Sequence, residues 1–301
     1  MRKKYTFPGL LILVAVLLLV SACGGSSVTA GQLLSNSATA MKQIKSLHLD
    51  MTATEGFSIS GLPSTGTSSS IPGSMNINLK ASGDEVLPDQ TSLKLTTSGI
   101  GNFAFAEIVK GNQVYLQNAQ GKWYVMDKSA LTGSSSSFSS LFSSASVPDF
   151  NKLLDLVQKD VTVADHGDES LNGANLRHIT VTLDKTGLSN LLNSTGQLQG
   201  ITGQSLDSLF GSLNKFGATL DFWFDESTSY LHRFEMKLNM AMDLSKFVTP
   251  TLGATTGSPA GISINADIVV DLSKFNDPSI KITAPANATQ TDNPGVIFGG
   301  A

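Results

Sequence analysis

Four histidines are the residues whose side chains could bind a metal ion or carry protons between reacting groups. No two of them have the pair spacing that zinc sites use, and each stands alone in a segment that reads as strand or loop. We therefore expect isolated surface side chains, and neither a metal site nor an acid–base pair, at His48, His166, His178 and His232.

A short group of carboxylates, Asp165, Asp168 and Glu169, could attract a cation. The surrounding residues favour a solvated turn between Val163 and Leu171 instead. The chain contains no Gly-x-Ser-x-Gly elbow, Walker loop, dinucleotide fingerprint or Ca²⁺ loop. We expect no catalytic residues, no metal and no cofactor, and therefore a protein that is not an enzyme.

Cys23 is the single cysteine of the 301-residue chain, and it directly follows Leu19-Val20-Ser21-Ala22, which forms a lipobox. In that pattern a lipid is attached to the thiol before the chain is cut in front of the cysteine. Basic residues at 2–4 and an apolar stretch at 10–20 complete a secretory signal, and the stretch is shorter than the roughly 20 residues of a membrane-spanning helix. We expect a signal peptide at 1–22, a lipidated tether at 23–30 and attachment to the outer leaflet of the cytoplasmic membrane. The alternative is an uncleaved N-terminal anchor with an incidental cysteine.

The charge balance of the mature chain limits its partners. The signal contains three of the 20 basic residues and none of the 24 acidic ones, which leaves a formal charge of about −7. This argues against nucleic acid or an anionic membrane surface as the main electrostatic partner. With its one cysteine assigned to the lipid, the protein has no internal disulfide and depends on a hydrophobic core.

Strict alternation of apolar and polar residues is the dominant pattern after residue 46. It is typical of antiparallel strands with one buried and one wet face. Two segments, 234–244 and 262–272, keep the alternation long enough to span roughly 35 Å each at ~3.3 Å per residue. The shorter segments with this pattern are 47–54, 75–81, 93–97, 102–110, 114–117 and 122–127.

Helical spacing marks four segments, at 30–45, 148–159, 186–193 and 205–214. The first begins with Thr29 and Gln32 at capping-box spacing. Serine-rich stretches at 58–73 and 132–146 read as loops. We predict the α+β class: one domain at 31–285, built as a single curved antiparallel β-sheet (a half-barrel) with short helices covering its concave face, followed by a disordered tail at 286–301.

The apolar face of this sheet is the candidate ligand site. Sheet and helices either close into a dry core or leave a cavity suited to acyl chains, and the pattern alone favours the dry core. Each methylene buried in such a cavity would contribute ~0.8 kcal/mol. The candidate lining residues are Leu153, Val157, Leu209 and Leu213 on the helices and Met236, Leu238, Met240, Ile264 and Ile268 on the strands.

Several motifs in a fixed order carry a resemblance to a known family. After the lipobox come 40–49 (AMKQIKSLHL), the hairpin segments 111–115 and 121–124, the segment 148–157, and Leu171-Asn172-Gly173 before a strand. The segments 220–225, 271–275 and 282–285 follow. This order resembles the mycobacterial LppX/LprAFG lipoprotein family, whose members have a LolA-like fold. The resemblance implies a half-barrel with a cavity for lipids or lipoglycans, no catalytic residues, and a cavity in preference to a dry core.

The leading hypothesis from the sequence is therefore a membrane-anchored lipoprotein that carries the acyl chains of a lipid or lipoglycan across the cell envelope without covalent chemistry. The alternative is a surface interaction or sensor lipoprotein with a solid core and a protein partner. A hydrolase ranks third, because no nucleophile–base pair can be named.

Overall fold

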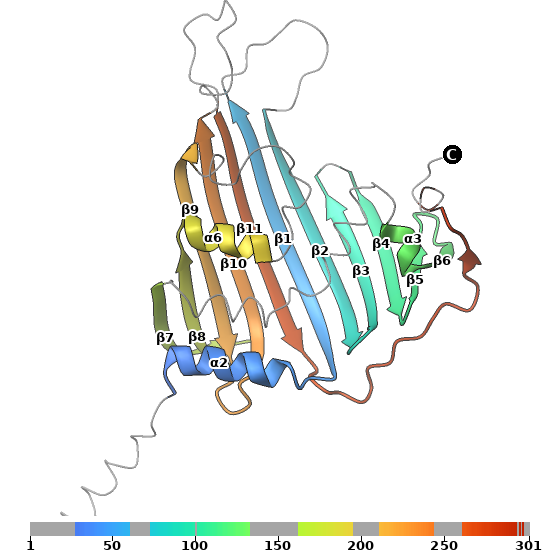
Figure 1. Cartoon of the computed structure of the whole chain (residues 1–301), viewed down its shortest axis with the longest axis horizontal. Coiled ribbons are helices and arrows are strands. Elements are labelled where there is room, and N and C mark those ends of the chain that lie inside the picture. Colours follow the sequence, from blue (N-terminus) through green and yellow to red (C-terminus); the bar gives the residue numbers. More distant parts are fainter. Residues whose placement is uncertain are drawn as a thin grey trace, which may run out of the picture.

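The computed structural model describes residues 28–60, 73–99, 101–132, 162–194, 211–243, 261–293, 295 and 297. These residues form one 12-stranded sheet in the order β12-β6-β5-β4-β3-β2-β1-β11-β10-β9-β8-β7 (Figure 1). The sheet is curved and does not close, and short helices accompany it, which confirms the predicted α+β half-barrel. The strands are β1 Ser46–Ser60, β2 Ser74–Val86, β3 Gln90–Ser98, β4 Phe103–Lys110, β5 Gln113–Gln117, β6 Trp123–Asp127, β7 Thr162–Leu171, β8 Ala174–Leu183, β9 Leu213–Phe224, β10 Leu231–Asp243, β11 Gly261–Ser273 and β12 Thr289–Gln290.

The centre of the sheet is formed by strands from the two ends of the chain. β1 pairs antiparallel with β11 over 13 residue pairs, from His48 opposite Ser273 to Ser60 opposite Gly261, with no shift of register. Because side chains alternate across a strand, this register places the apolar residues of both strands on one face. The polar residues, such as Asp50 opposite Asp271, lie on the other face.

The first helix, α2 (Ala30–Met41), covers one end of the apolar face. Thr29 and Gln32 form the predicted capping box. Leu33, Leu34 and Met41 are buried in one core with side chains of β1 and β8–β11. The helix ends four residues earlier than predicted, because Ile44 turns into the core beside Leu47 and the chain is already extended at Ser46.

Two other helices are described. α6 (Lys185–Ser194) follows β8 and buries Leu188 in the core that α2 covers, and α3 (Lys128–Thr132) follows β6. None of the helices in the described part of the chain has the length and apolar character that crossing a membrane requires. The predicted helix at 148–159 and most of the predicted loops at 58–73 and 132–146 lie outside the described residues.

The segment at 163–171, predicted as a turn, is a strand. β7 pairs with β8 through a bulge between Asp165 and Gly167, and the turn follows at Asn172 and Gly173, both with positive φ. The sequence did not reveal this strand because β7 lies at the edge of the sheet. An edge strand needs no continuous apolar face, and β7 is exposed along almost its whole length.

The segment after Pro285 also differs from the disordered tail that the sequence predicts. Thr289 and Gln290 form β12, which pairs parallel with Tyr124 and Val125 of β6. Ile297 is buried in a second hydrophobic cluster with Val114, Leu116, Tyr124 and Met126. The open edge of β6 supplies hydrogen-bonding groups and this cluster supplies apolar contacts, so Thr289, Gln290 and Ile297 are held in place although they lie near the end of the chain.

A substitution at Phe222 tests whether the buried side chains of α2, β1 and β8–β11 form the main hydrophobic core. The ring of Phe222 is fully buried and lies 5.4 Å from the ring of Phe234 and 5.9 Å from that of Phe224. Phe222→Ala should lower the free energy of unfolding by about 3–5 kcal/mol, because it removes a large buried ring and leaves a cavity. Urea unfolding followed by circular dichroism measures the change.

Phe103→Ala is the matched control, because 59% of Phe103 is exposed. This substitution should change the free energy of unfolding by no more than about 0.5 kcal/mol. Equal losses for the two variants would contradict the assignment of the core.

Candidate functional site

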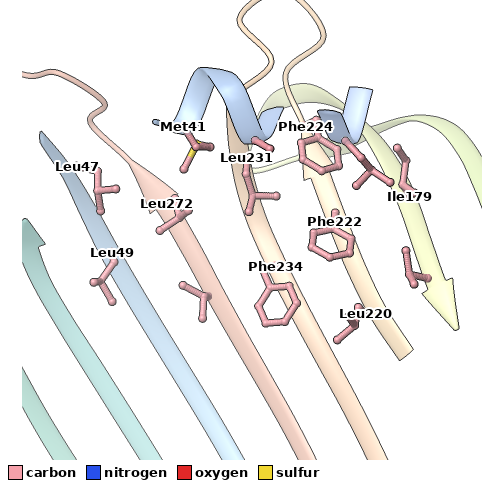
Figure 2. Close-up of a cluster of buried hydrophobic side chains, with 14 of the residues drawn as sticks. Met41, Leu47, Leu49, Ile179, Leu220, Phe222, Phe224, Leu231, Phe234 and Leu272 are labelled. Carbon is pink, nitrogen blue, oxygen red and sulfur yellow. The ribbon is translucent and has the colours of Figure 1, made fainter. Parts of the chain in front are cut away.

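The apolar face of the sheet is closed beside α2. Figure 2 shows Leu231, Phe234 and Leu272 projecting from β10 and β11 on the face that α2 covers. All three are buried, and the buried row continues through Phe222 and Phe224 on β9. This end of the face is a packed core.

The same face is more exposed farther along the same strands. On β10 the buried Phe234 is followed on its face by Met236 and Met240, which are only half-buried. On β11, going away from α2, the buried Val270 is followed by the half-buried Ile268. We call this more exposed region the far half of the concave face. Its other half-buried members are Met51, Phe57, Met75, Ile77, Leu79, Leu238, Met242, Ile262 and Ile264.

One row across the sheet shows where the face opens. Residues opposite one another run from Val181 on β8 through Leu220, Met236, Ile268, Ala53, Leu79 and Thr97 to Phe103 on β4. Val181 and Leu220 have no exposed surface, whereas Phe103 is 59% exposed. Coverage of the concave face therefore decreases from β8 toward β4 as well as away from α2.

Five residues that the sequence predicted as ligand contacts lie together in the far half. Met236 is opposite Ile268, Met240 is opposite Ile264, and Leu238 lies between these pairs on the same face. The alternation in the sequence was sufficient to place them, since neither strand shifts register here. Their contact with a ligand stays a prediction.

Leu213 reaches this face from a strand, so the predicted helix at 205–214 is wrong at its end. Leu213 begins β9, opposite Met242, and is half-buried against the main core. The period-two alternation of the residues after it already belongs to the strand, which pairs with β10 from its first residue. The remaining predicted site residues lie outside the described part of the chain: Cys23, Leu153, Val157 and Leu209.

Glu55 is a residue of this face that sequence reasoning missed. The unbroken register of β1 puts it on the face of Ala53 and Phe57, opposite Ile77 on β2 and Ala266 on β11. Its side chain is exposed. Water therefore reaches the middle of an otherwise apolar surface. Continuing the alternation two residues beyond Ala53 would have found it.

Two more carboxylates point to the concave face nearer the other edge of the sheet. Glu107 on β4 lies opposite Leu93 and Leu116. Burial raises the pKa of Glu107 to about 7, against a smaller opposing effect of the positive charge of Lys128. Burial also raises the pKa of Glu85, which lies opposite Leu47. The cross-strand neighbours of Glu107 are both leucines, whereas Glu85 lies between Leu47 and Thr91.

The outer face contains an ordered cluster around His178, where an isolated side chain was predicted. Its ring stacks on Trp223 at 4.2 Å and on His166 at 4.5 Å. Its two nitrogens bond to Glu169 and Asp221 at 3.0 and 2.9 Å. The three strands β7, β8 and β9 supply these groups, so their meeting depends on strand order, which the spacing in the sequence does not reveal.

His48 and His232 also differ from the isolated surface side chains that the sequence predicts. His48 bonds to Asp84 at 2.6 Å, so it too has a partner. His232 packs edge-on against Phe275, and burial lowers the pKa of His232 despite the opposing charge of Asp225. Three of the four histidines, His48, His166 and His178, thus have a hydrogen-bond partner.

The carboxylates at 165–169 are engaged with other residues. Asp165 accepts hydrogen bonds from Arg177, which lower the pKa of Asp165. Glu169 accepts a hydrogen bond from the indole of Trp223. Within the described residues, no three His, Cys, Asp or Glu side chains are placed to hold a metal ion.

No protein-family model and no curated protein sequence matches the chain. A comparison with solved structures does find matches. The chain is similar to LprF and LppX. For LprF from Mycobacterium bovis the identity is 14%, with 85% of this chain and 97% of that one covered and a TM-score of 0.42. For LppX from Mycobacterium tuberculosis the identity is 15%, with 85% of this chain and 100% of that one covered and a TM-score of 0.37.

A putative outer membrane lipoprotein-sorting protein domain from Vibrio parahaemolyticus also matches, with 11% identity, 82% of this chain and 93% of that one covered, and a TM-score of 0.22. LprF and LppX bear the names of the family that the sequence resembles.

The raised pKa of Glu107 predicts how stability depends on pH. The folded state binds this proton more tightly than the unfolded chain, whose glutamate titrates near its usual 4.5. Stability therefore falls as the pH rises from about 4.5 to about 7. Glu107→Gln should raise the free energy of unfolding above pH 8 by on the order of 2–3 kcal/mol and leave it nearly unchanged near pH 4.

Urea unfolding at both pH values measures this difference. Asp267→Asn is the control, because it removes one negative charge from an exposed position on β11. The same effect of Glu107→Gln at both pH values would refute the titration of Glu107.

Proposed function

We propose that this protein is a membrane-anchored bacterial lipoprotein that binds the acyl chains of a lipid or lipoglycan on the far half of the concave face. It acts as a non-enzymatic carrier in the cell envelope. The observation that carries the proposal is the half-buried state of Met236, Leu238 and Met240 on β10. β10 lies between β9 and β11, well inside the sheet. In a solid core these side chains would be buried as Phe234 is.

An acyl chain is the ligand whose chemistry fits this surface. The far half presents Met, Leu, Ile and Phe side chains in neighbouring rows, and each methylene that they take out of water contributes ~0.8 kcal/mol. Methionines make up a large part of it, at positions 51, 75, 236, 240 and 242. Their unbranched side chains adapt to chains of different shape. Binding of this kind forms no covalent bond and is reversible.

The anchor is the second part of the proposal. The lipobox supports attachment of a lipid to Cys23, followed by removal of residues 1–22. Only Gly24 to Thr29 separate this cysteine from α2. The folded domain is therefore held close to the outer leaflet of the cytoplasmic membrane, where lipids are available.

Lipid content of a soluble form tests the proposal. A chain that begins at Gly24 retains every residue that the structure describes. After incubation with envelope lipids, native mass spectrometry should detect this form with a bound lipid. A ligand-free protein under these conditions, with a copurifying protein partner, would favour the interaction lipoprotein with a solid core.

A matched pair of variants locates the bound chains. Met240 and Asn239 are neighbours on β10 whose side chains lie on opposite faces, opposite Ile264 and Asn265. Met240→Asp should reduce lipid occupancy about tenfold or more, because it places a charge against the acyl chains. Asn239→Asp adds the same charge to the outer face and should leave occupancy unchanged. Equal occupancy in the two variants would exclude the far half as the binding surface.

A further inference from the structure

Glu55 stands in the middle of the proposed acyl-chain surface. Its opposite neighbours are Ile77 and Ala266, and the next residues on its own face of β1 are Ala53 and Phe57. Ala53 and Ala266 extend only one carbon from the backbone, so they leave the longer side chain of Glu55 uncovered. This accounts for a carboxylate that is exposed although its neighbours on the same face are buried or half-buried.

The carboxylate is unpaired with any described residue. No hydrogen bond or ion pair joins Glu55 to another residue of the described segments. A second feature is the absence of a cation. Among the described residues of the far half, Glu55 is the one charged side chain, and neither Lys nor Arg shares this surface. The carboxylate of Glu55 can accept hydrogen bonds. The described part of this surface has no positive charge that could neutralise an anionic ligand.

We infer that Glu55 selects the head group of the bound lipid, by accepting a hydrogen bond from a hydroxyl of an uncharged head group and by excluding a phosphate. This inference rests on the proposed function. Hydrogen bonds from hydroxyls to carboxylates are short and strong. Sites for phosphate supply N–H donors, arginine or lysine, and the described far half supplies none of these. A phosphate in contact with Glu55 would meet a like charge well within the Debye length of about 8 Å, so the two charges repel each other although water reaches the site.

Two lipids with identical chains test this inference. Dioleoylglycerol and dioleoyl phosphatidate differ only in a hydroxyl or a phosphate on the third glycerol carbon. The chain that begins at Gly24 is incubated with dioleoyl phosphatidylcholine vesicles that contain equal amounts of both. Native mass spectrometry then measures how much of each is bound. The wild-type protein should bind dioleoylglycerol in preference to phosphatidate by about tenfold or more.

Glu55→Gln removes the charge with little change in shape, so the preference should fall to about threefold or less. Glu55→Lys should reverse the preference in favour of phosphatidate. Asp267→Asn removes the same charge from the outer face of β11, opposite Thr54 and Lys237, and should keep the wild-type preference. Both positions are exposed, and circular dichroism confirms that each variant is folded.

The outcomes separate this inference from the proposed function. Wild-type protein that binds both lipids equally, or Glu55→Gln protein that keeps the full preference, would overturn the role of Glu55 and leave acyl-chain binding intact. A failure of all four proteins to bind either lipid would refute the proposed function, and the role of Glu55 with it.

Discussion

The pairing of β1 with β11 is the constraint on which the rest of the structure depends. It joins a strand near the beginning of the chain to one near its end, over 13 residue pairs without a shift. A slip of one residue would exchange the two faces of the strand. Leu49 and Met51 would then face outward, and His48 and Asp50 would enter the core. The register therefore decides which surface is apolar, and with it where a ligand could bind.

The division of the concave face into a closed and an open part follows from the lengths of its elements. α2 has 12 residues and is about 18 Å long. β1 has 15 residues and spans about 50 Å. α2 lies across the ends of β7 to β11 (Figure 1). A helix of this length covers one end of these strands and does not extend over the far half of the concave face. On β1 the last buried residue of this face is Ala53, and none of the residues after it on the strand is buried.

Alternation in the sequence predicted most of the fold, because each central strand has one apolar face and keeps its register. It placed Met236 and Ile268 on the same surface without knowledge of the pairing. It did not reveal the strand β7, whose edge position removes the apolar face. Nor did it reveal the cluster at His178, whose partners come from strands that only the topology brings together. Glu55 was within reach of the pattern, but a charged residue at an inward position reads as the end of a strand.

The position of the proposed anchor determines which way the far half of the concave face points relative to the membrane. The residues between Cys23 and Val28 span at most about 20 Å when fully extended, and α2 then begins beside the closed end of the sheet. From Ser46 to Glu55, β1 rises about 30 Å away from that end. When the strands point away from the membrane to which the tether is attached, the far half of the concave face therefore lies on the side of the domain that is farthest from that membrane. For the proposed carrier, uptake of a lipid from its own bilayer would require the domain to lie against that bilayer, whereas the upright position would present the far half of the concave face to the next layer of the envelope. A carrier needs both positions, and a short tether at the closed end allows them without any change in the sheet.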